Sequence, residues 1–223
     1  MNLTSISKSE AARYMGIKGE PDSQIREILD RAEKTVRENV KPKYVYREAL
    51  ISFTADGVRV EGMSVPLTGK DIVKHLSGCN EVIILAATLT GDADKLIRQT
   101  GINGMAEALA VDCLCSAAVE QVCNRAEEEI FSHTDAAYRT WRFSPGYGDL
   151  PLELNKDILV YLNAARRIGL TVTEDSLLIP SKSVTAIIGI SDKPVQKGAR
   201  GCAVCNMRDR CAFSGKGGCG KNN

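Results

Sequence analysis

The feature that most constrains the fold is a run of eight residues, Val82 to Leu89, that is almost entirely apolar (VIILAATL). A run without a polar face is typical of a strand covered on both sides, since either exposed face would carry apolar side chains. The fold must therefore place one layer on each side of this strand. With 223 residues, 43% of them hydrophobic, the chain is long enough to bury about 70% of its unfolded surface in one domain.

Helical patterns precede and follow this strand. Between Ala106 and Ser132, apolar residues recur at steps of three, four and seven, which predicts a long helix. Asp112 falls on the same stripe, and we interpret it as an acid at the water-facing edge, with a buried carboxylate as the alternative. Further helices are predicted at residues 8–15, 22–41, 71–76 and 151–169.

Short β-patterns lie among the helices. Residues 48–54 and 58–61 read as two strands joined at Asp56-Gly57, a dipeptide typical of hairpin turns. Three more strands are predicted at residues 171–173, 177–179 and 184–190. Because hairpins and helices mix without a regular βαβ alternation, we predict an α+β fold with a largely antiparallel mixed sheet flanked by helices.

Composition excludes several classes of protein. The formal net charge is +1, which argues against a broad nucleic-acid-binding face, so we expect no nucleic-acid partner. No run of about 18 apolar residues predicts a transmembrane helix, and the first residues lack the apolar core of a signal peptide. We therefore expect a cytoplasmic protein without a membrane partner, whose eight cysteines are reduced rather than paired as disulfides.

The last part of the chain differs from the rest, which suggests a main domain at 1–193 and a Cys-rich basic tail at 194–223. From Val195 onward the charge is +5, which leaves −4 for the preceding residues. This basic tail could steer an acidic partner or simply be solvated. Four cysteines could bind a [4Fe–4S] cluster or a structural zinc ion, or remain free thiols; they are Cys202, Cys205, Cys211 and Cys219.

A second chemical motif runs from Arg142 to Asp149 (RFSPGYGD). Its proline and glycines predict a tight turn that exposes the backbone, and a helix start after it could present N–H groups to an anion. The Arg142 guanidinium can form a bidentate contact with a carboxylate, and the Tyr147 ring can contact a cation or a base. The isolated histidines, His75 and His133, are interpreted as ordinary surface or cap residues.

Residues 141–191 resemble the activation domain of cobalamin-dependent methionine synthase. The resemblance is carried by the Arg-x-Ser/Ala-Pro-Gly-Tyr turn, by residues 168–174 (IGLTVTE) and by the Pro-x-x-Ser-Val run at 180–184. It implies a domain that binds S-adenosylmethionine and supports reductive methylation of cob(II)alamin on a separate methionine synthase or related corrinoid protein.

The resemblance also implies roles for individual residues. Arg142 would bind the methionyl carboxylate, Ser144 and Gly146 would offer main-chain contacts, and Tyr147 would face the ligand. Ile188 and Gly189 stand where the family has an aromatic pair, so only backbone contacts are expected there. We find no equivalent of the family's N-terminal ligand-binding aspartate.

Three accounts of the protein's role follow. The first is a reactivation factor that holds the methyl donor near a corrinoid, without an acid–base residue of its own. In this account a cluster in the tail would deliver the activating electron, replacing or docking a flavodoxin or ferredoxin. The first alternative is an iron–sulfur electron carrier for corrinoid proteins that does not bind S-adenosylmethionine. The second alternative is an interaction module whose tail is held together by zinc.

Overall fold

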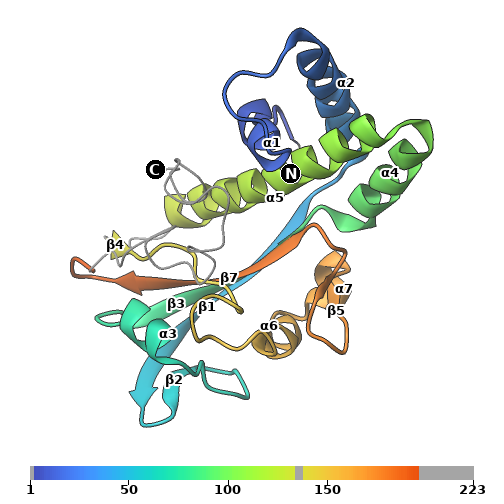
Figure 1. Ribbon diagram of the computed structural model, residues 1–223. Helices are drawn as coiled ribbons and strands as arrows, with labels where there is room; N and C mark the ends of the chain where they lie inside the picture. The colour runs from blue at the N-terminus through green and yellow to red at the C-terminus, as the bar shows by residue number, and fades with distance from the viewer. Residues whose placement is uncertain (1–2, 134–137, 196–223) are drawn as a thin grey trace.

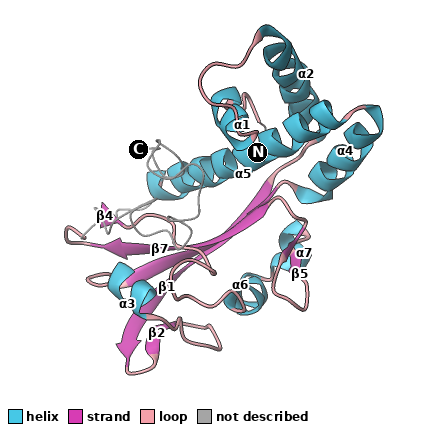
Figure 2. Ribbon diagram, viewed as in Figure 1, coloured by secondary structure: helices cyan, strands magenta, loops and turns pink. Residues whose placement is uncertain are grey.

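The computed structural model describes residues 3–133 and 138–195, which form an α+β fold (Figure 1). A group of helices lies at one end of a long twisted sheet, and two shorter helices pack on one face of that sheet (Figure 2). The predicted fold class is confirmed. The four tail cysteines, Cys202, Cys205, Cys211 and Cys219, lie outside the described residues.

The main sheet has five strands in the order β2-β1-β3-β7-β4, and every neighbouring pair is antiparallel. A separate two-stranded sheet pairs β5 with β6. The strands are β1 (Lys43–Thr54), β2 (Gly57–Val60), β3 (Glu81–Thr88), β4 (Tyr138–Arg139), β5 (Thr171–Val172), β6 (Leu178–Ile179) and β7 (Ser183–Ser191).

The apolar run predicted as a doubly covered strand is β3, at the centre of the sheet. Seven of its eight residues are buried, and its side chains alternate between two cores. Ile83 and Leu85 pack in a cluster with α5 (Met105–Ser132), whereas Val82 and Ile84 pack in a cluster with α6 (Leu154–Leu162). The physical reason given for the strand is therefore confirmed.

Strand β7 follows the same alternation along its whole length. Ala186, Ile188 and Ile190 face α5, and Ile187 faces α6. Eight residue pairs fix its register against β3, from Ser183 opposite Thr88 to Ile190 opposite Glu81. Any even-numbered residue that continues β7 at its start is therefore directed towards the α5 side.

Three further helices pack with α5 around one apolar cluster: α1 (Lys8–Tyr14), α2 (Ser23–Asn39) and α4 (Thr90–Asn103). The start of α2 is capped as its sequence predicts, because the Asp22 carboxylate accepts a hydrogen bond from the Ile25 amide at 2.8 Å. The short helix α3 (Lys70–His75) matches the helical turn predicted near residue 71.

The structure differs from the sequence prediction at several places, including three in the longer elements. Helix α4 was not predicted, because Gly91 and Gly101 weaken its pattern. The helix predicted at residues 151–169 is two helices, α6 and α7 (Ala164–Ile168), separated by Asn163 in the left-handed conformation. Strand β1 begins at Lys43, five residues before its predicted start.

Within the described ranges, 3–133 and 138–195, no helix has both the length and the apolar character needed to span a membrane.

Candidate functional site

The Arg142–Asp149 motif is positioned by β7. The Thr140 amide donates to the Gly189 carbonyl at 2.9 Å, and the Gly189 amide donates to Thr140 Oγ1 at 2.8 Å. Phe143 and Ile187 exchange two backbone hydrogen bonds. The segment before the turn thus runs along β7, and side-chain alternation directs Arg142 to the face covered by α5.

Arg142 is bound by three side chains of α5. Its guanidinium forms ion pairs with Glu127 and, at 3.2 Å, with Glu120, and it donates to Asn124 Oδ1 at 2.8 Å. These three residues lie on one face of the helix at steps of four and three. The Arg142 and Glu127 side chains are only 20% and 15% exposed, so this contact also fixes the turn segment against α5.

The turn itself is closed by its own backbone. The Gly146 amide donates to the Leu150 carbonyl at 2.9 Å, and the Leu150 and Tyr147 amides each donate within the same loop at 3.0 Å. Gly146 has φ +87°, a conformation that favours glycine. The main-chain groups of this turn are therefore largely used in holding its shape.

Asp149, the last residue of the motif, lies at the start of α3 and not at the start of the helix that follows the motif. Its carboxylate accepts hydrogen bonds from the amides of Lys70, at 2.7 Å, and Asp71, at 3.0 Å. These bonds from Asp71 and Lys70 lower the pKa of Asp149. The N-terminus of α3 thus receives an anion from the protein itself, and Asp149 does not cap the helix that follows the turn.

A cluster of aromatic side chains packs around the turn. Trp141, Phe143 and His75 lie within 5.3 Å of one another by ring centroids, and Tyr147 is 6.1 Å from Phe143. His75 was interpreted as an ordinary surface or cap residue; it is the last residue of α3 and packs edge-on against Trp141. Tyr147 is 54% exposed, which leaves one side of its ring open to solvent.

Ile188 and Gly189 are interior positions. Ile188 is fully buried in the cluster beneath α5. A Cβ atom on Gly189 would lie 2.5 Å from Cys79 Sγ and 2.9 Å from Leu76 Cδ2. The structure thus brings both residues close to the segment that carries Arg142, but with their surfaces covered by protein atoms.

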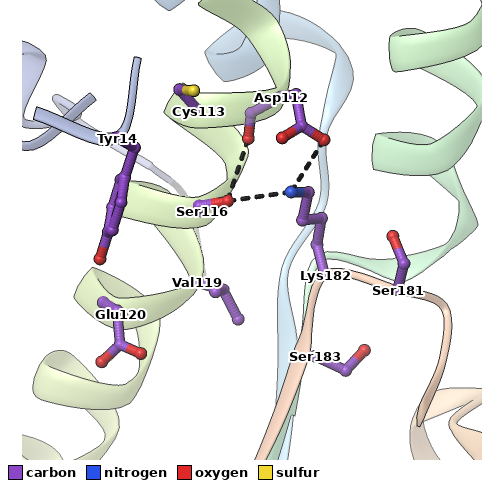
Figure 3. Close-up of a pocket in the computed structure, with 9 residues that line it drawn as sticks. All are labelled: Tyr14, Asp112, Cys113, Ser116, Val119, Glu120, Ser181, Lys182 and Ser183. Carbon is purple, nitrogen blue, oxygen red and sulfur yellow. Dashed lines mark hydrogen bonds and ion pairs between the residues drawn. The ribbon is translucent and has the colours of Figure 1, made fainter. Parts of the chain in front are cut away.

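A cavity of about 410 Å³ lies further along the same face, between α1, α5 and the start of β7 (Figure 3). This volume falls within the range of about 300–1,000 Å³ typical of small-molecule sites. Nine residues line it: Tyr14, Asp112, Cys113, Ser116, Val119, Glu120, Ser181, Lys182 and Ser183.

Lys182 lies across this cavity from the side of β7 (Figure 3). Its ammonium group is 2.9 Å from Asp112 Oδ1 and donates to Ser116 Oγ, also at 2.9 Å. The Lys182 side chain is 15% exposed and that of Asp112 44%. Asp112 is therefore at the helix edge, as interpreted from the sequence, but ion-paired.

Glu120 joins the cavity to the motif, because it lines the cavity and also pairs with Arg142. Arg142 itself is not among the described residues that line the cavity. Sequence reasoning did not single out Lys182 or Tyr14 as site residues. A signal for Lys182 was present, since it lies inside the Pro-x-x-Ser-Val run and two residues before a predicted strand.

The described residues contain no group of three or more His, Cys, Asp and Glu side chains that could hold a metal ion. Cys113 lines the cavity, but burial raises the pKa of its thiol, which makes it a poor thiolate ligand. The described residues thus form an α+β domain in which acidic and basic side chains line this cavity.

Comparison with known proteins identifies the kind of domain. Residues 71–195 match the family described as "Vitamin B12 dependent methionine synthase, activation domain". This match covers more than half of the chain, so the protein belongs to that family. No curated protein sequence matches the chain.

A solved structure with the same fold is titled "Crystal Structure of the MetH Reactivation Domain bound to AdoHcy". It is similar to this protein with a TM-score of 0.64 and 12% identity, over 88% of this chain and 79% of that chain. At this identity the likeness establishes the fold, which extends beyond the residues that the family match covers.

Proposed function

We propose that the protein binds S-adenosylmethionine in the cavity between α1, α5 and β7 and supports the reductive methylation of a corrinoid on a partner protein. Membership of the activation-domain family supports the corrinoid partner, with methionine synthase as the first candidate. The solved structure with the same fold is bound to AdoHcy, the product that remains when S-adenosylmethionine loses its methyl group.

The observation that carries this proposal is the charge pattern of the cavity. Asp112 and Glu120 are acids suited to the ammonium and sulfonium centres of the ligand, and Lys182 is a cation suited to its carboxylate. Tyr14 offers an aromatic ring at the cavity wall for the adenine base, because it is 40% exposed.

The chain's contribution to the reaction is positioning. The partner's corrinoid, once reduced by one electron from a separate reductant, would accept the methyl group, and the sulfonium that loses it would become a neutral thioether. No proton has to move, so the protein needs only to hold the donor in the right orientation and exclude competing nucleophiles.

The motif residues have a supporting place in this proposal. Arg142 fixes Glu120, which is a wall residue of the cavity. Tyr147 is exposed and remains a predicted contact for ligand or partner. Ser144, Gly146, Ile188 and Gly189 remain predicted only as backbone contacts.

A titration of S-adenosylmethionine by calorimetry tests ligand binding directly. Ser116→Phe should abolish binding, because its ring would fill the cavity beside Lys182. Ser132→Phe, at the exposed end of α5, is the matched control and should bind as wild type does. A wild-type protein that releases no heat and shows no shift in melting temperature would contradict the proposal.

Function is tested by reactivation of a methionine synthase trapped in the cob(II) state. We expect methylation to require this protein, S-adenosylmethionine and a reductant together. A rate that is the same with and without the protein would contradict the corrinoid role even if the ligand binds.

The metal predicted at Cys202, Cys205, Cys211 and Cys219 is tested separately, since these residues lie outside the described part of the chain. Anaerobically purified protein should contain iron with broad visible absorbance if a cluster is present, or stoichiometric zinc if the site is structural. Cys205→Ser should remove either metal, whereas Cys79→Ala, in the main domain, should not.

A further inference from the structure

A second cavity, of about 610 Å³, lies between α1 and α2, the two N-terminal helices, and the loop that joins them (Figure 1). Its volume falls within the range of about 300–1,000 Å³ typical of small-molecule sites. Of the described residues that line it, none also lines the cavity between α1, α5 and β7. The two cavities are therefore separate.

Part of the wall of this second cavity is apolar. Ala12 and Leu29 line it and are 4% and 1% exposed, and Ile17 lines it from the loop. All three belong to or pack against the apolar cluster around α5. The Ile17 amide donates to the Ala12 carbonyl at 3.1 Å, which holds the start of the loop against α1. The cavity thus has a fixed apolar surface that can contact the apolar part of a ligand.

The remaining wall carries more cations than acids. Four basic and two acidic residues line the cavity: Lys8, Arg13, Lys18, Arg26, Glu20 and Asp30. This surplus of two positive charges is local, because residues 1–194 together carry a charge of −4. A concave surface lined by charge of one sign concentrates ions of the opposite sign. The charge pattern therefore favours an anionic ligand.

Two of the four cations already have acidic partners. Lys8 forms an ion pair with Asp30, and Arg13 forms one with Glu10 at 2.5 Å. These two pairs balance their own charge and hold the helices in place.

The other two cations, Lys18 in the loop and Arg26 on α2, are exposed. Within the part of the chain that the structure describes, neither forms an ion pair with a carboxylate. Arg26 donates from Nε to the Asp22 carbonyl at 3.4 Å. A guanidinium has five N–H donors and an ammonium group three, so both side chains have donors left for a ligand.

We propose that this cavity binds a small phosphate monoester with an apolar or aromatic body. A phosphate monoester carries a charge of about −1.5 to −2 at neutral pH, which matches the surplus of two positive charges better than a single carboxylate does. Arg26 binds the phosphate through its planar fork and Lys18 as a point charge, while the body contacts Leu29 and Ile17. This site does not depend on the proposed function.

Equilibrium dialysis of the full-length protein against three probes tests both parts of the site. The probe 1-naphthyl phosphate has an aromatic body and a phosphate, whereas inorganic phosphate lacks the body and 1-naphthol lacks the phosphate. We expect 1-naphthyl phosphate to bind about tenfold more tightly than either of the other two, because only it makes both sets of contacts. S-adenosylmethionine should not displace it, since the two cavities share no lining residue.

Substitutions locate the bound probe. Lys18→Met and Arg26→Met should each weaken the binding of 1-naphthyl phosphate by about tenfold, because each removes a charge-assisted hydrogen bond. Lys34→Met is the matched control and should bind as wild type does, because Lys34 is 74% exposed on α2 and does not line the cavity. Thermal melts of all variants show whether each is folded at the temperature of the dialysis.

Several outcomes would overturn this inference. It is wrong if wild type does not bind 1-naphthyl phosphate, or if inorganic phosphate or 1-naphthol binds equally well. It is also wrong if S-adenosylmethionine displaces the probe, or if the Lys18 and Arg26 variants bind it as tightly as wild type or no more weakly than Lys34→Met. The calorimetric titration of S-adenosylmethionine decides the proposed function separately.

Discussion

Arg142, at the start of the turn motif, and the α5–β7 cavity both contact α5, but the turn is closed by its own contacts and the cavity is open. In the turn, polar groups are used by the protein itself: Arg142 by α5, and Asp149 by the start of α3. In the cavity, Lys182 and Asp112 are paired across a space of about 410 Å³. The charged groups of the motif thus have partners in other elements of the protein, whereas those of the cavity border an accessible space.

The largest expected effect comes from Arg142→Ala. This change leaves Glu127, which is 15% exposed, without its partner and should lower the free energy of unfolding by about 3 kcal/mol. Urea unfolding measures the change. Arg139→Ala removes only a cation–π contact with Phe131 and should cost about 1 kcal/mol or less. An Arg142→Ala protein of wild-type stability would contradict a closed turn.

Gly189→Ala probes the same comparison from β7. Its new methyl group would press on Cys79, Leu76 and Thr140, so we expect a loss of about 2 kcal/mol in unfolding free energy. Gly91→Ala, where a Cβ atom meets open space, is the control and should be neutral or stabilising. If instead Gly189→Ala kept full stability and lost S-adenosylmethionine binding, Gly189 would face a ligand.

Asp149→Ala should cost about 1 kcal/mol at neutral pH, because α3 loses its N-terminal anion. The folded state lowers the pKa of Asp149 below its usual 3.8, so its contribution is present above that pH. The contribution is lost as pH falls through the lowered pKa. Denaturation across this range should show the two proteins converging in acid, whereas the exposed Asp175→Ala control should show little difference throughout.

The smallest expected effect is a difference in alkylation rate between two cysteine thiols. Burial raises the pKa of Cys123, on the Arg142 side of α5, to about 12 and raises that of Cys113 as well. Cys123 is fully buried, whereas Cys113 lines the cavity. At pH 8 we expect Cys113 to react slowly with iodoacetamide and to be protected by S-adenosylmethionine, and Cys123 not to react. Peptide mass spectrometry measures both, and faster labelling of Cys123 would contradict this order.

Much of the fold could be predicted because its patterns are local. The apolar run at Val82–Leu89 indicated a doubly covered strand, and Asp22 indicated the start of α2. Helix α4 could not be predicted in the same way, because two glycines hide its pattern and its stability depends on packing against α5 and α2.

The site was less predictable than the fold. The sequence indicated that Arg142 could bind a carboxylate, but it could not show that Glu120 and Glu127 already supply two. Lys182 and Asp112 are 70 positions apart in sequence, and their contact exists only because β7 and α5 lie side by side. A local sequence pattern shows which kinds of contact a side chain can make, but the partner of each charged group depends on the tertiary arrangement.

The alternation of β7 also limits how this domain can change in evolution. Lys182 and the β7 residues that face α5, such as Ile188, lie on the same side of the sheet because an even number of positions separates them. Insertion or deletion of one residue in this strand would turn the lysine to the opposite side of the sheet, away from Asp112, whereas a two-residue change would keep its direction. Among relatives that keep this lysine, we therefore expect insertions and deletions within the strand to involve an even number of residues. Insertions and deletions of any length are expected only in the loop before it.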